Sequence, residues 1–156
     1  MTGVQTCALP ICFPVTIGAG VGGGIVTDGK IISGSHGAGG EIGHIKVSDN
    51  ETEYCGCGKK GCLEQYASAT GIVNLANKIL STTKMKSKLR EFEYISAKDI
   101  FDSAKVGDEL ALTLVDDFSV NLGKALANIS CVIDPEIFVI GGMYIVTGKQ
   151  IGRAHV

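Results

Sequence analysis

The sequence predicts an α/β fold, with strands near both ends and a helical second half. Largely apolar runs at 13–17 and 136–140, the second beginning with Glu136, are typical of strands. An Asp-Gly pair at 28–29, between two short apolar runs, indicates a hairpin. Residues 70–133 repeatedly place apolar side chains at helical spacing. The 156 residues suffice for one domain or one lobe of a larger protein.

Composition and charge favour a small molecule or a protein as partner. The net charge is −2 and no basic run occurs, which argues against binding to nucleic acid or to an anionic membrane surface. No apolar stretch approaches the roughly 18 residues needed to cross a bilayer. The first basic residue is Lys30, so the charged start of a signal peptide is missing. We therefore expect a cytoplasmic protein.

A glycine-rich segment, Gly18-Ala-Gly-Val-Gly-Gly-Gly24, follows the first predicted strand. It contains the Gly-x-Gly-x-x-Gly pattern of dinucleotide-binding folds, but that pattern requires a helix to begin within the loop. Here a second strand is predicted to begin at Ile25, and the Lys and Ser/Thr of a Walker A loop are absent. Two interpretations remain. The bare backbone amides could cradle an anion, or the segment is a tight turn with a structural role only.

Residues 41–64 contain the side chains of a metal site. Three of the six cysteines lie within eight residues, and a histidine stands eleven positions before the first of them. One imidazole and three thiolates satisfy the tetrahedral coordination of Zn²⁺ without a further ligand. Glycines between the cysteines would let the backbone turn tightly, including through positive φ. The four candidate ligands are His44, Cys55, Cys57 and Cys62, and the interleaved glycines are Gly56, Gly58 and Gly61. The alternative is ordinary buried thiols or disulfide partners.

Glu41 and Glu64 bracket the candidate metal site. Carboxylates held by a rigid site suit polyhydroxylated ligands, because each hydroxyl donor needs an acceptor. We expect His44 to begin a short strand over 44–47, with its second ring nitrogen within reach of a substrate hydroxyl. Either glutamate could instead simply face solvent. His36 is expected to be a solvent-exposed loop histidine.

Three helices are predicted beyond the metal stretch. Thr70 would cap the first, which continues to Leu80. Ser96 and Asp99 have the spacing of a capping box at the start of the second, which ends near Ala104. The irregular connection over 82–95 carries basic side chains that are expected to form a solvated surface.

The third predicted helix spans 109–133 and ends before Asp134-Pro135. Asp116 and Asp117 are expected to be surface carboxylates, because adjacent helix positions point about 100° apart and cannot share one site. Cys131 is expected to be a core thiol. The predicted buried stripe consists of Leu110, Leu114, Val115, Phe118, Leu122, Ala125, Leu126, Ile129 and Val132. The strand at 136–140 is predicted to be buried and to end in Gly141-Gly142.

These residues closely resemble the ROK family, named for repressors, open reading frames and sugar kinases. Its signature is Glu-x-Gly-His, a spacer of about ten residues, and Cys-x-Cys-Gly-x-x-Gly-Cys-x-Glu, and every fixed position is matched between Glu41 and Glu64. The wider runs starting at Gly20, Ala38 and Ala67 look most like the bacterial glucokinase branch. The resemblance covers roughly residues 13–143.

The resemblance implies an actin-like, hexokinase-like (ribonuclease H-like) α/β lobe with a zinc knuckle, here incomplete. Structural Zn²⁺ would be bound by His44, Cys55, Cys57 and Cys62, and hexose hydroxyls by Glu41, His44 and Glu64. ATP with Mg²⁺ would contact Gly18, Ala19, Gly20, Gly22, Gly23, Gly24, Gly141 and Gly142. Ala19 stands where the family usually has Thr, which removes one possible phosphate contact.

The implied activity is ATP-dependent phosphorylation of a hexose, glucose to glucose 6-phosphate, by a full-length homodimer. In the family, the Asp base and the Asp-x-Gly-x-Thr phosphate loop lie upstream, so we expect this chain to be an inactive fragment. Segments 1–12 and 144–156 do not continue the family pattern and are predicted to be translated adapter sequence. Two alternatives remain: the sugar-binding effector domain of a ROK repressor with a separate helix-turn-helix, and a zinc-stabilised module without a ligand.

Overall fold

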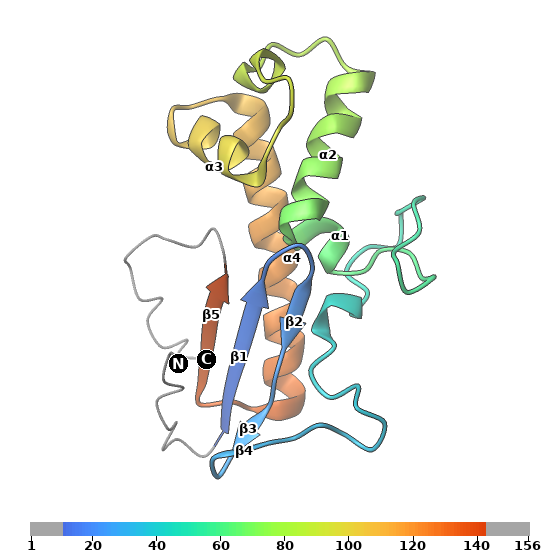
Figure 1. Cartoon of the computed structure of the whole chain (residues 1–156), viewed down its shortest axis with the longest axis vertical. Coiled ribbons are helices and arrows are strands. Elements are labelled where there is room, and N and C mark those ends of the chain that lie inside the picture. Colours follow the sequence, from blue (N-terminus) through green and yellow to red (C-terminus); the bar gives the residue numbers. More distant parts are fainter. Residues whose placement is uncertain (1–10, 143–156) are drawn as a thin grey trace.

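The computed structural model describes residues 11–142 (Figure 1). These residues form a five-stranded sheet with helices packed against it. The central strand β1 (Ile11–Ile17) pairs on one edge with β5 (Ile137–Gly142), parallel to it. Its other edge pairs antiparallel with β2 (Val21–Gly23) and β3 (Val26–Thr27), and β3 continues into β4 (Lys30–Ile31). The fold is the α/β class that the sequence predicts.

Two turns shape the sheet. Asp28 and Gly29 connect β3 to β4 with φ of 50° and 71°, as a type I′ hairpin turn requires, so the predicted hairpin is confirmed. The glycine-rich segment differs from expectation. Its second strand begins at Val21 and not at Ile25, because Val21, Gly22 and Gly23 pair with β1, and the turn is confined to residues 18–20.

The helical half consists of α1 (Glu64–Ala67), α2 (Ala69–Thr82), α3 (Ala97–Lys105) and α4 (Glu109–Ile133). Two short 3₁₀ turns are also present: η1 (Ile42–His44) lies between β4 and α1, and η2 (Lys88–Glu91) lies between α2 and α3. Figure 1 shows α4 running along the sheet and on to α2 and α3. The core joins Phe13 and Val15 of β1 with apolar side chains of α2, α3 and α4.

Side-chain caps define where the helices begin. Ser96 and Asp99 form both hydrogen bonds of the predicted capping box at α3. The cap of α2 is Ser68 and not Thr70, because the Ser68 hydroxyl accepts from the Gly71 amide at 2.8 Å. The helix α4 ends before Asp134, as the Asp-Pro pair predicts, and Asp134 itself has a φ of 47°.

Three burial predictions are wrong. Cys131 is exposed, because it lies two positions, or about 200° around α4, from the buried Ile129. Val132 is 81% exposed and borders an apolar groove formed with Ile129 and Ile133. The strand β5 is only half-buried, since within residues 11–142 it pairs with β1 on one edge alone.

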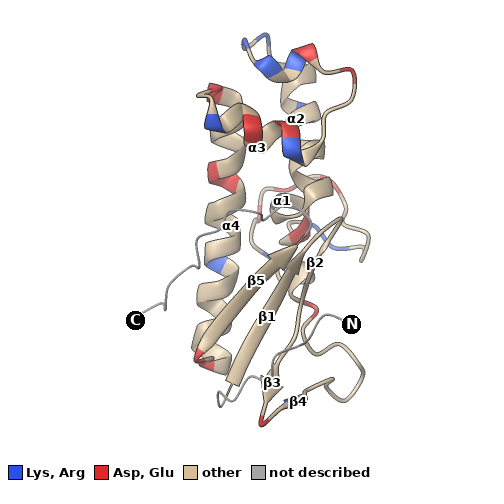
Figure 2. Ribbon diagram, turned by 60° about the vertical axis from the view of Figure 1, so that its left-hand side comes forward, with Lys and Arg blue, Asp and Glu red and all other residues tan. Residues whose placement is uncertain are grey.

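Charged side chains lie on helices, loops and the short strand β4, whereas β1, β2 and β5 carry none. Figure 2 shows acidic and basic residues interspersed over the helices in that view. Asp116 and Asp117 are exposed, as predicted, and so are the basic residues of the 82–95 connection. Over residues 11–142 we find no helix with the length and apolar character needed to span a bilayer. The predictions for the two terminal segments fall almost wholly outside the described residues.

Candidate metal centre

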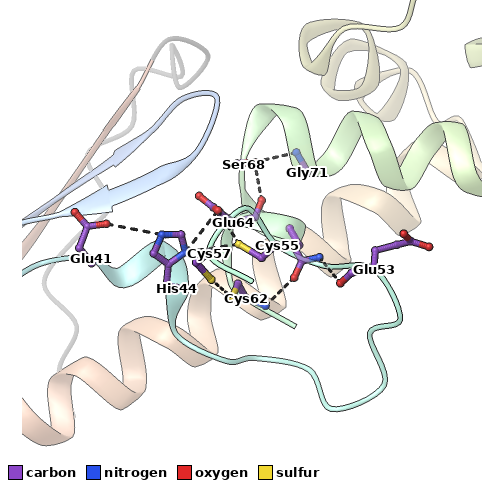
Figure 3. Close-up of polar contacts among 10 residues, drawn as sticks. Glu41, His44, Glu53, Cys55, Cys57, Cys62, Glu64, Ser68 and Gly71 are labelled. Atoms are coloured by element: carbon purple, nitrogen blue, oxygen red, sulfur yellow. Dashed lines mark hydrogen bonds and ion pairs between the residues drawn. The ribbon is translucent and has the colours of Figure 1, made fainter. Parts of the chain in front are cut away.

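The structure brings the four predicted metal ligands together. The ligand atoms of His44, Cys55, Cys57 and Cys62 all lie within 4.8 Å of one another (Figure 3). The Cys55 Sγ lies 3.6 Å from His44 Nδ1, and the Sγ atoms of Cys57 and Cys62 are also 3.6 Å apart. A tetrahedral ion with Zn–S bonds near 2.3 Å requires about 3.8 Å between sulfurs. The spacing therefore fits Zn²⁺.

A loop that folds back on itself presents the three cysteines. We call residues 46–62 the knuckle loop; bridges between Lys46 and Cys62 and between Tyr54 and Lys60 join its two arms. Gly61 has φ of +76°, and a Cβ there would lie 1.9 Å from the Ser48 carbonyl oxygen. Gly58 has φ of +81°. Positive φ thus explains two of the three interleaved glycines, whereas nothing in the structure requires Gly56.

His44 enters the site from a different local structure than predicted. It is the last residue of η1 and does not begin a strand. The Ile45 amide donates to the Ile42 carbonyl at 3.0 Å, which tightens the turn. Within the described residues, the nearest β-type pairing is the isolated bridge between Lys46 and Cys62. The tight turn directs the imidazole toward the knuckle loop (Figure 3).

The environment of the thiols suits a cation. Burial raises the pKa of Cys55 to about 12 and raises that of Cys62, because a buried thiolate lacks a compensating charge. The exposed Cys57 differs, since a hydrogen bond involving the Lys59 backbone lowers its pKa. A divalent ion would supply the missing positive charge and displace the thiol protons. Three sulfurs and one imidazole are donors that Zn²⁺ favours.

Glu64 and Glu41 lie on opposite sides of the His44 ring (Figure 3). Glu64 Oε1 is 3.5 Å from His44 Nδ1 and accepts the Cys55 thiol at 2.9 Å. Glu41 Oε2 is 4.0 Å from Nε2, and its side chain is 64% exposed against 25% for Glu64. With Nδ1 directed at the thiols, Nε2 remains available to a ligand or to Glu41. The expected solvent exposure of His36 is confirmed.

Glycines make room for the Glu64 carboxylate. A Cβ at Gly20 would lie 2.9 Å from Glu64 Oε2, and one at Gly43 would lie 3.4 Å away. Gly20 therefore links the glycine-rich turn to the metal centre, a role that sequence spacing gave no means of predicting. Beside these residues is a cleft of about 700 Å³, lined by Ala19, Gly20, Cys55 and Glu64 and extending along α2 to Lys78.

The two predicted nucleotide segments meet at one end of the sheet. Gly141 and Gly142 pair in parallel with Thr16 and Ile17, so β5 ends beside the turn that begins at Gly18. A Cβ at Gly142 would lie 2.0 Å from the Ile17 carbonyl oxygen, so this close approach requires glycine. Ligands commonly bind where parallel strands end at their carboxyl side.

The backbone amides of the glycine-rich segment are not all available to an anion. Those of Gly18, Gly23 and Gly24 donate to carbonyl oxygens of Gly20, Gly40 and Pro14 at 2.9, 2.9 and 3.0 Å. Gly22 lies within β2, opposite Thr16. The tip of the turn, Ala19 and Gly20, instead lines the large cleft.

The fold and the metal centre together define a hexokinase-like α/β lobe with a Cys₃His cluster, and comparisons with known proteins agree. The ROK family model matches residues 6–150, and the chain belongs to the ROK family. A glucokinase of Halalkalibacterium halodurans is 44% identical over 131 residues, which cover 82% of this chain and 40% of that protein. An N-acetylmannosamine kinase of Escherichia coli is 36% identical, with 82% and 40% covered.

Solved structures share the same fold. A ROK glucokinase from Streptomyces griseus, solved with glucose and AMPPNP, is 31% identical with a TM-score of 0.74, covering 86% of this chain and 45% of that one. A ROK transcriptional regulator described as a homolog of the E. coli MLC protein is 35% identical with a TM-score of 0.76, covering 86% and 33%. This chain thus spans less than half the length of these relatives.

Proposed function

We propose that this chain is part of a ROK sugar kinase that transfers a phosphoryl group from ATP to a hexose, with glucose as the first candidate. The metal cluster between two carboxylates, at the edge of a cleft that also reaches the glycine turn, is the observation that carries this proposal. The relatives named glucokinase and N-acetylmannosamine kinase support a sugar as substrate. Glucose is chosen because the glucokinase relative has the higher identity.

Zn²⁺ is proposed as a structural ion held by His44, Cys55, Cys57 and Cys62. When bound, it supplies a closed four-ligand centre that fixes the knuckle loop and leaves no open position to activate water. Three thiolate ligands require a reducing compartment, so we also propose a cytoplasmic location.

Glu41, His44 and Glu64 are proposed to bind the sugar hydroxyls. Ionised carboxylates are acceptors only, so each can take a hydroxyl proton donor of a hexose. Glu64 is the more restrained of the two acids, because its side chain is 25% exposed against 64% for Glu41 and its Oε2 lies against Gly20. A sugar lacking the matching hydroxyl would leave a partly buried acceptor unpaired, which gives the site its selectivity.

ATP with Mg²⁺ is proposed to lie at the end of the sheet where the glycine turn meets β5. The proposed contacts are Gly18, Ala19, Gly20, Gly22, Gly23, Gly24, Gly141 and Gly142, with the turn tip nearest the transferred phosphate. Phosphoryl transfer also needs a base beside the attacking hydroxyl. We propose that this base belongs to another part of the full-length protein, which would act as a homodimer. We also propose that residues 13–143, within the stretch 6–150 that the family model matches, form the lobe fragment.

A chimera tests the proposal directly. Residues 13–142 replace the matching segment of the Halalkalibacterium halodurans glucokinase, and glucose phosphorylation is measured in a coupled assay. The chimera is expected to be active, and its Glu64→Gln variant to lose about 100-fold or more in kcat/KM for glucose. Asp49→Asn, an acid of the knuckle loop with an 89% exposed side chain, is the matched control. The chain by itself is expected to bind zinc without turnover.

A chimera that folds and holds zinc but phosphorylates neither glucose nor N-acetylmannosamine would contradict the kinase proposal. The second candidate function is the sugar-binding effector domain of a transcriptional repressor, favoured by the likeness to the ROK regulator. It predicts sugar-dependent stabilisation of the chimera without phosphoryl transfer.

A further inference from the structure

Three successive residues of α1 contact three alternate residues of the knuckle loop. The pairs are Glu64 with Cys55, Gln65 with Glu53, and Tyr66 with Glu51. Cys55 and Glu51 make these contacts through their side chains, and Glu53 through its backbone carbonyl. The short helix α1 therefore lies along residues 51–55, the part of the knuckle loop that leads to its first cysteine.

Gln65 joins the two arms of the loop. Its Nε2 donates to the Glu53 carbonyl at 3.0 Å, and its Oε1 accepts the Cys62 amide at 3.0 Å. These bonds fix the backbone two residues before Cys55 and at Cys62 itself. Both cysteines are buried, so a shift of either arm would carry its sulfur away from His44.

Glu51 anchors the far end of the same arm. Its side chain is only 8% exposed although its neighbours Asn50 and Thr52 are exposed. Oε2 accepts the Tyr66 hydroxyl at 2.7 Å, and Oε1 accepts the Thr52 and Glu53 amides at 2.8 and 2.9 Å. Lys78 of α2 approaches Oε1 at 3.8 Å. A carboxylate with this many partners ties the loop to both α1 and α2.

The charge of Glu51 is stabilised where it lies. Burial would raise its pKa, but hydrogen bonds from the Glu53 amide, the Tyr66 hydroxyl and the Thr52 amide together lower it. The carboxylate therefore stays ionised at neutral pH and remains an acceptor for Tyr66.

We propose that Gln65 and Tyr66 are positioning residues that hold the knuckle loop against α1, so that Cys55 and Cys62 already face His44 before a metal ion binds. The inference rests on the metal site proposed above and extends it to side chains that touch no metal. Because Glu64 belongs to the same helical turn, the contacts that retain the ion also fix the position of the proposed sugar-binding carboxylate.

If Gln65 and Tyr66 hold the ligands in place, the wild-type chain should release zinc slowly and variants at these positions should release it faster. Residues that orient metal ligands without binding the metal typically contribute 10- to 100-fold in metal affinity. Tyr66→Phe removes the single hydroxyl that reaches Glu51. Gln65→Leu removes both bonds of the bridge while keeping a side chain of similar size. Each variant is expected to release zinc about tenfold faster than the wild type.

The experiment loads the 156-residue chain with zinc and follows transfer of the metal to a chromogenic chelator. Glu53→Gln is the matched control, because it keeps the backbone carbonyl used by Gln65 and alters a side chain that is 73% exposed. Glu51→Gln keeps an acceptor oxygen for Tyr66 and is expected to stay closer to the wild-type rate than Glu51→Leu.

Release rates of Tyr66→Phe and Gln65→Leu within twofold of the wild type, with zinc bound stoichiometrically in all three, would overturn the inference and leave the metal site intact. A wild-type chain that retains no zinc would reject the metal site itself, and the inference with it.

Discussion

The knuckle loop and the helical region are stabilised by different physical means. In α2, α3 and α4, apolar side chains such as Ile72, Ile100 and Leu114 are fully buried, and polar side chains cap the helix starts. The knuckle loop buries little besides Cys55, Gly61, Cys62 and the side chain of Glu51. Its shape depends on glycines at positive φ, contacts with α1 and a cluster of metal ligands. The difference implies that the two regions can be perturbed separately.

The largest expected effect is the loss of a metal ligand. Cys62→Ser removes a buried sulfur from the cluster, and structural zinc sites contribute on the order of 10 kcal/mol of apparent binding free energy. We expect stoichiometric zinc to be lost and the knuckle loop to become protease-sensitive, while the far-UV signal of the helices persists. Metal content and limited proteolysis measure this. Cys131→Ser, on the exposed face of α4, should change neither.

The converse change is made in the helical core. Leu114 is 1% exposed, so Leu114→Ala should lower the free energy of unfolding by about 3 kcal/mol through lost burial and the remaining cavity. Urea unfolding measures this loss, and zinc content at low urea should stay at the wild-type level. Leu112→Ala, at a 44% exposed position of the same helix, serves as control and should cost less than about 1 kcal/mol. Equal losses at the two positions would contradict the described core.

Two glycines of the knuckle loop allow a finer comparison. Gly61→Ala adds strain at positive φ and a clash with the Ser48 carbonyl, so we expect a cost of about 2 to 3 kcal/mol and faster zinc release. Gly58→Ala meets positive φ in open space and should cost only about 1 kcal/mol. Thermal unfolding of the zinc-loaded variants compares them. If Gly58→Ala were the more damaging, the geometry of the loop would be wrong.

The smallest effect concerns the start of α4. Burial opposes ionisation of Asp108, but bonds from the Ala111 and Lys88 amides and the Ser87 hydroxyl lower its pKa below the ordinary 3.8. A lowered folded-state pKa contributes stability that is present above about pH 4 and is lost as pH falls through the folded value. Asp108→Asn should therefore cost about 1 kcal/mol at pH 7 and less at pH 3.

Urea unfolding at both pH values measures the Asp108 effect. Asp116→Asn, at an exposed position of the same helix, is the control. An Asp108→Asn cost that grows on acidification would show that the carboxylate is not stabilised as described.

The same division explains what the sequence could predict. Helix periodicity, the capping box at Ser96 and the Asp-Gly turn are local signals, and the structure confirms them. The spacing of the cysteines predicted their convergence, because ligand geometry limits the arrangements. Those signals act over a few neighbouring residues.

Contacts between distant segments were not predictable in the same way. Gly20 makes room for Glu64, and Glu51 is anchored by Tyr66, across separations that no local pattern encodes. The predicted strand start at Ile25 was wrong for the same reason, because pairing with β1 makes the strand begin at Val21. The exposure of Cys131 follows instead from its position around α4. From the sequence alone, a loop acid such as Glu51 cannot be told from a solvent-exposed acid, because its partners Tyr66 and Lys78 are distant in sequence.

The account depends most on four side chains sharing one metal ion. X-ray absorption at the zinc edge, combined with metal content, tests this on the purified chain. One zinc per chain with three sulfurs near 2.3 Å and one nitrogen is the predicted result. A folded chain without bound zinc, or an ion surrounded mainly by oxygen, would contradict it.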